Sequence, residues 1–202
     1  MVTYLNGGSM KKSFLKRKEA IILSAIEIID ELGFQGLSTK ELAKSQEITE
    51  GALYKHFTSK EEIILAVIDY YGHYDDIIAQ TVEMKNMAPK DALVFAVGFL
   101  AEYYENYPAI TAIANSYEVF KYNSLAKDKI RAIHEKRVEF LSNLILRGVN
   151  LGDFPNSVKA EQFAKVIKGF FRETISEWRM NDYNFSLKER ILSTLDMLFS
   201  IY

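Results

Sequence analysis

The sequence predicts an all-α fold, and two observations lead to that prediction. Its 202 residues include only three prolines and ten glycines, so residues that interrupt helices are rare. Apolar residues recur three or four positions apart along nearly the whole chain, whereas the alternation typical of half-buried strands is not found between turn signals. We therefore expect helices joined by short loops, and no sheet.

In the N-terminal third, capping residues mark where helices begin and end. Residues 12–32 carry apolar side chains on one helical face, and Gly33 is suited to end this helix. The following helix starts are marked by hydroxyl side chains at Ser38, Thr49 and Ser59, the first and last completed as capping boxes by Glu41 and Glu62. The helix that begins at Ser59 is expected to continue to about residue 83.

The rest of the chain is also expected to be helical. A helix should begin after Pro89 and run to residue 106, with shorter helical pieces between Pro108 and residue 123. A long helix over residues 125–149 should end in a loop at 150–156. The last two helices carry the broadest apolar stripes, one over residues 163–178 and the other over 187–202.

Composition excludes several classes of protein. The chain has no cysteine, so it forms no disulfides and no thiolate metal site. Its longest apolar run, residues 92–101, is much shorter than a membrane span, and its first ten residues lack the apolar core of a secretion signal. The three histidines, His56, His73 and His134, have no metal-binding or catalytic spacing. We expect a cytoplasmic protein that is not an enzyme, has no cofactor or metal, and does not contact membranes.

Charge is distributed unevenly along the chain. The formal net charge is −2, yet residues 1–60 contain nine Lys or Arg against seven Asp or Glu, while the remainder contains 16 against 20. A polyanionic partner is therefore expected to meet the N-terminal third. The basic cluster at residues 11–18 is more simply explained as a solvated surface, and residues 1–11 are expected to form a flexible arm.

Residues 39–53 have the spacing of a helix-turn-helix unit. Ala43 is small enough for two helices to cross there, and the turn lies near residues 46–48. Leu53 and Phe57, four residues apart, are expected to face the core. The opposite side of the second helix is then left free to enter the major groove of DNA.

A longer stretch, GFQGLSTKELAKSQEITEGALYKHFTSKEEII at residues 33–64, resembles the DNA-binding domain of the tetracycline-repressor (TetR) family of bacterial transcriptional regulators. The resemblance rests on Gly33-Phe34, on Thr39, on Leu53-Tyr54-Lys55-His56-Phe57 and on Lys60. Beyond Ile64 it is limited to overall length, helix order and a penultimate helix that contains tryptophan. It implies a DNA-binding domain at residues 12–60 and an effector-binding and dimerisation domain at 61–202.

The resemblance implies two kinds of DNA contact. Contacts to the phosphate backbone are implied for Thr39, Lys40, Tyr54, His56 and Lys60. Positions where base edges are read are implied for Thr49, Glu50, Gly51 and Lys55. A lysine in the first turn of a helix opposes the helix dipole, and a bound phosphate would offset that cost at Lys60.

The chain departs from the family pattern at Glu47, where the family usually has glycine. A residue with a side chain must either tolerate a left-handed backbone there or adopt another turn. Both possibilities leave the helix-turn-helix intact but affect the angle between its helices.

The apolar stripes of the last two helices have two explanations. They could form the core of one subunit, or, as the resemblance implies, pair across a two-fold axis in a homodimer. A dimer also suits the function, because two recognition helices read adjacent turns of a palindromic operator about 34 Å apart. The interface residues predicted on this basis are Phe163, Ile167, Phe170, Leu187, Ile191, Leu195 and Leu198.

Aromatic residues in the second domain raise a similar choice. They could simply fill the core, or they could surround an effector cavity with His134 as a polar group. The predicted ligand-binding residues are Phe99, Tyr103, Tyr107, Tyr117, Phe120, His134, Phe171 and Trp178.

Taken together, these patterns predict a ligand-responsive, sequence-specific regulator of transcription. We expect a homodimeric repressor that binds a palindromic operator in double-stranded DNA and is released by a small apolar or aromatic effector, whose identity the sequence does not give. The alternative is an architectural or partner-binding DNA-binding protein of the same fold without an effector. An empty, enclosed, aromatic-lined cavity in the second domain would favour the first, and a filled core the second.

Overall fold

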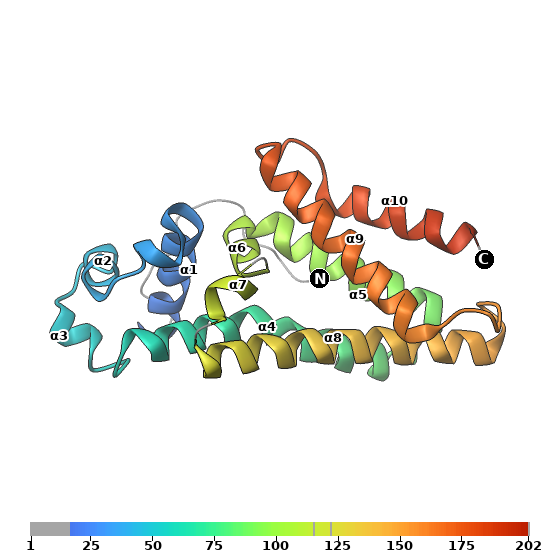
Figure 1. Ribbon diagram of the computed structural model, residues 1–202, viewed down its shortest axis with the longest axis horizontal. Helices are drawn as coiled ribbons and strands as arrows, with labels where there is room; N and C mark the ends of the chain where they lie inside the picture. Colours follow the sequence, from blue (N-terminus) through green and yellow to red (C-terminus); the bar gives the residue numbers. More distant parts are fainter. Residues whose placement is uncertain (1–16, 115, 122, 202) are drawn as a thin grey trace. The chain divides into compact units, whose positions relative to one another are not determined.

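The computed structural model describes residues 17–114, 116–121 and 123–201, with only the backbone described at Tyr117 (Figure 1). Every regular element in these residues is a helix, as predicted. None of the described helices is long and apolar enough to cross a membrane. The chain divides into two compact units between Val67 and Ile68.

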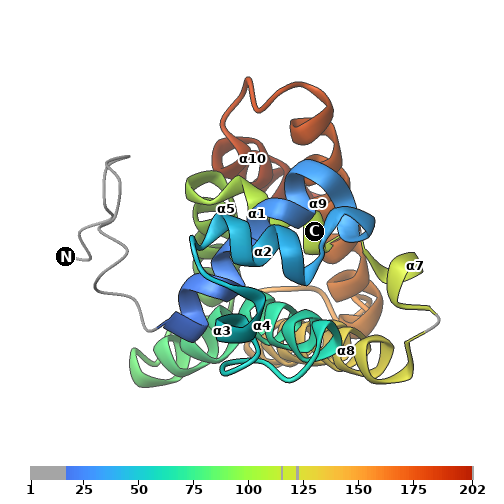
Figure 2. The same ribbon diagram turned by 90° about the vertical axis from the view of Figure 1, so that its left-hand side faces the viewer.

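The first unit contains α1 (Arg17–Gly36), α2 (Thr39–Ser45), α3 (Glu50–Leu53) and the first turns of α4 (Lys60–Met84). Its helix α2 packs against both α1 and α3 (Figure 2). The core between them is aliphatic and aromatic, and its fully buried side chains include Ile21, Ile26, Leu42, Leu53 and Phe57.

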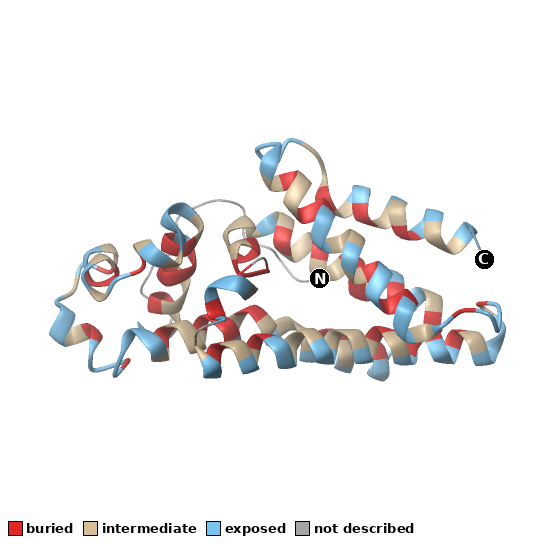
Figure 3. Cartoon of the chain, viewed as in Figure 1, coloured by how far each residue is buried: buried red, intermediate tan, exposed pale blue. Residues whose placement is uncertain are grey.

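The second unit contains the rest of α4, then α5 (Pro89–Asn106), η1 (Pro108–Ile110), α6 (Thr111–Ala114), α7 (Tyr117–Phe120), α8 (Ser124–Leu151), α9 (Ala160–Met180) and α10 (Leu187–Ser200). The helices α5, α8, α9 and α10 form its main packing, with α8 against α5 and α9, and α10 against the same two helices. Buried positions recur along α9 and α10 between exposed ones (Figure 3).

Most predicted helix boundaries agree with the structure because capping residues set them locally. Ser38 Oγ and Ser59 Oγ each accept the predicted hydrogen bond, from the backbone N–H of Glu41 and Glu62 respectively, at 3.1 Å. The Glu62 carboxylate, however, reaches the Thr58 N–H at 2.6 Å instead of the Ser59 N–H expected of a capping box. This contact with Thr58 is the main reason why the pKa of Glu62 lies below its usual value.

Two boundaries differ from the prediction. Gly33 does not end α1 but kinks it, with φ 70° and ψ 175°, and helical structure resumes as far as Gly36. The predicted loop at 150–156 begins later, because α8 continues to Leu151 and ends at Gly152 in a left-handed conformation (φ 84°). The predicted start of the first helix at residue 12 lies outside the described residues, as does the arm at 1–11.

Candidate functional site

The turn between α2 and α3 is built by a residue in a left-handed conformation. Glu47 has φ 54°, which confirms the first of the two possibilities predicted for this position. The N–H of Ile48 donates to the carbonyl of Ala43 at 2.9 Å, and that of Glu47 to the carbonyl of Lys44 at 3.1 Å. This pattern is a Schellman motif, which satisfies the last carbonyls of α2 and fixes the direction in which α3 leaves it.

Beyond this turn, α3 exposes the side predicted to meet DNA. Leu53 and Phe57 are buried, as predicted, and the Thr49 hydroxyl caps the helix by accepting from the Ala52 N–H at 3.1 Å. Tyr54 is 49% exposed. The other exposed residues among those predicted to contact DNA are Lys40, Thr49, Glu50, Gly51, Lys55, His56 and Lys60.

A hydrogen bond on this surface links a residue predicted to contact phosphate with one predicted to read base edges. The Thr39 hydroxyl, which is half-buried at the start of α2, donates to the Glu50 carboxylate at 2.7 Å. Glu50 thus places a negative charge beside a group predicted to bind phosphate. This charge lowers the attraction of the surface for any polyanion that does not engage Glu50 itself.

Contacts made by Lys18 and Gln46 also stabilise the first unit. Lys18 on α1 lies 3.3 Å from the Glu62 carboxylate and 4.7 Å from the centre of the Phe57 ring. The buried Gln46 amide donates to the Ser24 hydroxyl at 2.5 Å and holds the end of α2 on α1. These contacts hold α1 against the end of α2 and the start of α4.

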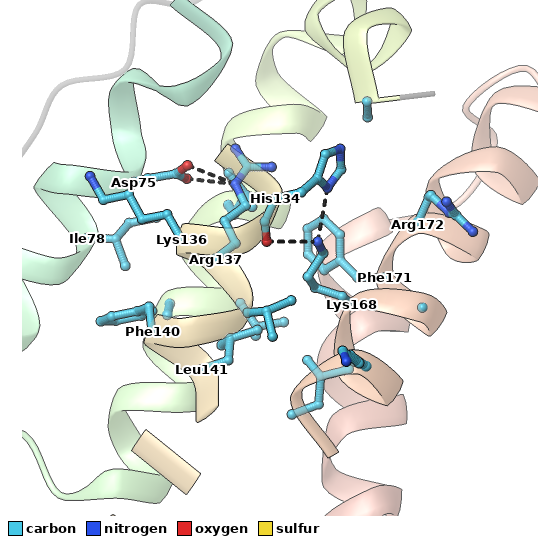
Figure 4. Close-up of a pocket in the computed structure, with 18 of the residues that line it drawn as sticks. Asp75, Ile78, His134, Lys136, Arg137, Phe140, Leu141, Lys168, Phe171 and Arg172 are labelled. Carbon is cyan, nitrogen blue, oxygen red and sulfur yellow. Dashed lines mark hydrogen bonds and ion pairs between the residues drawn. The ribbon is translucent and has the colours of Figure 1, made fainter. Parts of the chain in front are cut away.

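The second unit contains a cavity of about 340 Å³ between α4, α5, α8 and α9 (Figure 4). Its walls are mainly apolar and aromatic. Representative lining residues are Ile78, Val97, Phe140, Leu141 and Phe171. The volume falls at the lower end of the range typical of small-molecule sites.

One charged group in the cavity wall is fully paired. Arg137 on α8 donates through Nε to both carboxylate oxygens of Asp75 on α4, at 2.8 and 3.0 Å. Its Nη1 donates to the Tyr71 hydroxyl at 2.6 Å, and the guanidinium lies 4.4 Å from the centre of that ring. The side chains of Arg137 and Asp75 are only 13% and 11% exposed, so this ion pair is part of the packed wall.

A second charged group in the wall has no carboxylate partner in the described residues. Lys168 on α9 donates through Nζ to His134 Nδ1 at 3.0 Å and to the His134 carbonyl at 3.2 Å (Figure 4). Burial, followed by the charges of Arg137 and Arg172, lowers the pKa of Lys168 to about 8. Burial and the Lys168 ammonium lower the pKa of His134 to about 4, so its ring is neutral at pH 7 and Nδ1 accepts a hydrogen bond from the ammonium.

The structure brings two of the eight predicted ligand-binding residues to this cavity, His134 and Phe171. Phe99, Tyr103 and Tyr107 instead form an aromatic cluster with Tyr74, whose ring centre lies 4.3 Å from that of Tyr103. 

Three predicted ligand-binding residues remain. Phe120 is buried in the described part of the chain, and the side chain of Tyr117 lies outside it. Trp178 anchors the loop before α10, since its Nε1 donates to the Phe185 carbonyl at 2.8 Å.

Sequence reasoning missed Arg137 and Lys168 as cavity residues. For Lys168 the signal was weak, because this lysine lies at the edge of the apolar face of α9, with Lys165 and Arg172 as its neighbours one turn away. A lysine at such a position must reach either solvent or a polar site within the protein. Arg137 carries no comparable signal, since α8 is rich in charged residues throughout.

Five of the seven predicted interface residues are buried within the single chain: Phe163, Ile167, Leu187, Ile191 and Leu195. They pack where α9 and α10 meet the rest of the unit. Phe170 and Leu198 are half-buried. The apolar side chains that remain exposed on these helices include Val166 at 51% and Met197 at 55%.

Comparisons with known proteins agree with this architecture. Residues 21–67 match the family described as bacterial regulatory proteins, tetR family, and residues 69–200 match the YsiA-like protein, C-terminal region. The chain is 26% identical over 184 residues to the fatty acid metabolism regulator protein of Bacillus subtilis (strain 168), covering 89% of this chain and 92% of that protein.

Two solved structures share the fold. The fatty acid degradation regulator FadR from Bacillus halodurans has a TM-score of 0.77 at 19% identity, over 90% of this chain and 97% of its own. The transcriptional regulator FadR from Bacillus subtilis, in complex with stearoyl-CoA, has a TM-score of 0.76 at 22% identity, over 90% of this chain and 98% of its own. With matches that together span both units, the chain belongs to the TetR family of bacterial regulatory proteins and is a DNA-binding transcriptional regulator of the repressor type.

Proposed function

We propose that this protein is a cytoplasmic, homodimeric repressor that leaves a palindromic operator when an elongated aliphatic ligand of the fatty-acyl class fills its cavity. The observation that carries the ligand class is the mainly apolar cavity with basic groups at its polar end. The names of the relatives support the same class, since one is a fatty acid metabolism regulator and another was solved with stearoyl-CoA. An aliphatic ligand of this class is a narrower proposal than the apolar or aromatic effector expected from sequence.

The effector acts only if it binds more tightly to a conformation in which the recognition helices no longer match the operator. We assign operator binding to the predicted domain at 12–60 and effector binding to the domain at 61–202. The same fold without an effector is less well supported, because a cavity of about 340 Å³ is not the filled core that such a protein would have.

We further propose that the homodimer forms through the outer faces of α9 and α10. The inward faces are already covered by the same chain, so Val166 and Met197 are better placed to meet a partner than the five buried residues predicted from sequence. Sedimentation at micromolar concentration tests this proposal, and a monomeric mass would refute it.

The function is tested by selecting bound duplexes from a random DNA pool with the purified protein. We expect an inverted repeat whose affinity falls steeply as salt rises, because phosphate contacts release counterions. Fatty acids and acyl-CoA thioesters of several chain lengths are then added to the complex, and at least one is expected to release the DNA. If no duplex is enriched with or without these compounds, the proposed function is wrong.

Two substitutions separate the predicted roles on the DNA-binding surface. Lys60→Ala should weaken binding to all duplexes alike and reduce the salt dependence by about one phosphate contact. Lys55→Ala should instead cost about 1–3 kcal/mol on the selected operator and little on other duplexes. If both variants lost sequence preference equally, this division of roles would be refuted.

A further inference from the structure

The polar end of the cavity holds a cation with unused hydrogen-bonding capacity. An ammonium group has three N–H donors. Lys168 uses two of them on His134, one on Nδ1 at 3.0 Å and one on the carbonyl at 3.2 Å. The third donor of Lys168 has no acceptor in the described residues.

The other lysines in the cavity lining, and the guanidinium of Arg137, already have partners. Arg137 is held by Asp75 and Tyr71. Lys136 pairs with Asp76, and Lys165 pairs with Glu161 at 2.5 Å. Arg172 also lines the cavity, but it is exposed to solvent.

Lys168 therefore combines partial burial with a positive charge that no carboxylate of the described residues contacts directly, although Asp75 lies close enough to act on it. Burial of a cation without a counter-ion is unfavourable, and the neighbouring guanidinium groups increase that cost. An anion brought into the cavity would remove it by supplying both the opposite charge and the missing acceptor. Figure 4 shows Lys168 reaching from α9 toward His134 on α8, beside the apolar wall formed by Phe171 and Leu141.

We propose that Lys168, positioned by His134, is an anion subsite inside the cavity that binds the carboxylate of an unesterified aliphatic acid. This inference rests on the proposed function and specifies the ligand of the same site. A carboxylate neutralises the ammonium, whereas the carbonyl of a thioester is uncharged and cannot do so. The apolar walls then enclose the alkyl chain.

The cavity is partly open to solvent, so its volume sets no upper limit on that chain but guides the choice of a probe. At about 30 Å³ for each water-sized group, 340 Å³ accommodates on the order of ten methylene groups. A saturated acid of about this length, such as dodecanoic acid, is therefore a suitable probe. Its methyl ester has the same chain without the charge and is the matched control ligand.

The test is calorimetric titration of the full-length protein, without DNA, with dodecanoate, methyl dodecanoate and dodecanoyl-CoA. Wild-type protein is expected to bind dodecanoate about tenfold to a hundredfold more tightly than the ester, the range given by a hydrogen bond to a charged group. Lys168→Met should lose this preference and retain its affinity for the ester. Lys188→Met, which removes a lysine of α10 that is paired with Glu102 and does not belong to the cavity lining, should bind all three ligands as the wild type does.

The pH dependence gives a second readout. Lys168 faces His134 and Arg137 from α8, Arg172 from α9 and Asp75 from α4; its own pKa is lowered to about 8 and that of His134 to about 4. Because the carboxylate binds the protonated lysine, the affinity of wild-type protein for dodecanoate should fall as the pH rises above about 8. Lys168→Arg keeps its charge, so its affinity should stay level over the same range.

Either of two results would overturn the proposal: equal binding of dodecanoate and its ester to the wild type, or equal binding of dodecanoate to the wild type and a folded Lys168→Met variant. Tight binding of dodecanoyl-CoA that is lost in Lys168→Met would also overturn it, because the subsite would then serve the thioester. Thermal unfolding by circular dichroism establishes that the variant is folded, and Lys168→Arg provides the test if it is not. Since no DNA is present, failure here leaves the operator selection to decide the proposed function separately.

Discussion

The ion pair between Arg137 and Asp75 predicts a large and specific loss of stability. Both side chains are nearly buried, and the guanidinium is also held by the Tyr71 hydroxyl at 2.6 Å. Arg137→Met keeps most of the side-chain volume but leaves the Asp75 carboxylate in the wall without its counter-ion. Removal of one partner from a buried pair costs about 3–5 kcal/mol. We expect a loss of that size in the free energy of unfolding.

The double variant Arg137→Met, Asp75→Leu tests this explanation. With both charges replaced by apolar groups, the desolvation cost disappears along with the attraction, so stability should return to within about 1–2 kcal/mol of the wild type. Urea unfolding followed by far-ultraviolet circular dichroism measures the global change, and the fluorescence of Trp178, the single tryptophan, reports on the second unit. The reasoning is refuted if the double variant is as unstable as the single one.

Three further predictions concern other parts of the molecule. Folding lowers the pKa of His134 from 6.5 to about 4, so the unfolded chain binds more protons than the folded one between these pH values, and stability should decrease as the pH falls through this window. The full shift corresponds to a loss of at most about 3 kcal/mol in the free energy of unfolding, which partial exposure reduces to about 1–2 kcal/mol. The urea midpoint of His134→Gln should therefore vary less with pH than that of the wild type. Glu50→Gln removes a negative charge from the DNA-binding surface, so it should strengthen binding to random duplexes and lower the preference for the operator over them by about 1–3 kcal/mol, as measured by fluorescence anisotropy. An unchanged preference would show that Glu50 does not contact base edges. Gly148→Ala would place Cβ 2.6 Å from the buried Phe154 ring and should cost about 1–3 kcal/mol in thermal unfolding, whereas Gly169→Ala, which meets nothing within 4 Å, should stabilise by up to about 1 kcal/mol.

The helices could be predicted from sequence because their ends are set by neighbouring residues. The helix Pro89–Asn106 was predicted to within about one residue at its start, since proline fits the first turn of a helix and Pro108 prevents its continuation. The exposed side of α3 could be predicted for the same reason, once Leu53 and Phe57 were assigned to the core. Glu47 shows the limit of this reasoning: the sequence identified the position as strained but did not choose between the two possible turns.

The cavity could not be predicted in the same way, because it depends on which faces of distant helices meet. Phe99 and Tyr103 have the same spacing and chemistry as cavity residues, yet they pack against Tyr74 instead. Arg137 and Asp75 are far apart in the chain, and only the packing of α8 beside α4 brings them together. His134 was the polar group predicted for the wall, and the position of Lys168 at the edge of an apolar face gave only a weak sign of a second one.

The coverage of α9 and α10 by their own chain has a consequence for biosynthesis. Leu187, Ile191 and Leu195 are fully buried before any second copy arrives. Each polypeptide can therefore complete its hydrophobic core on its own, so a folded monomer should exist at low concentration, and the proposed pairing would raise the unfolding midpoint only as protein concentration increases. A newly made subunit at low abundance would be folded and protected from proteases while still too dilute to pair on an operator.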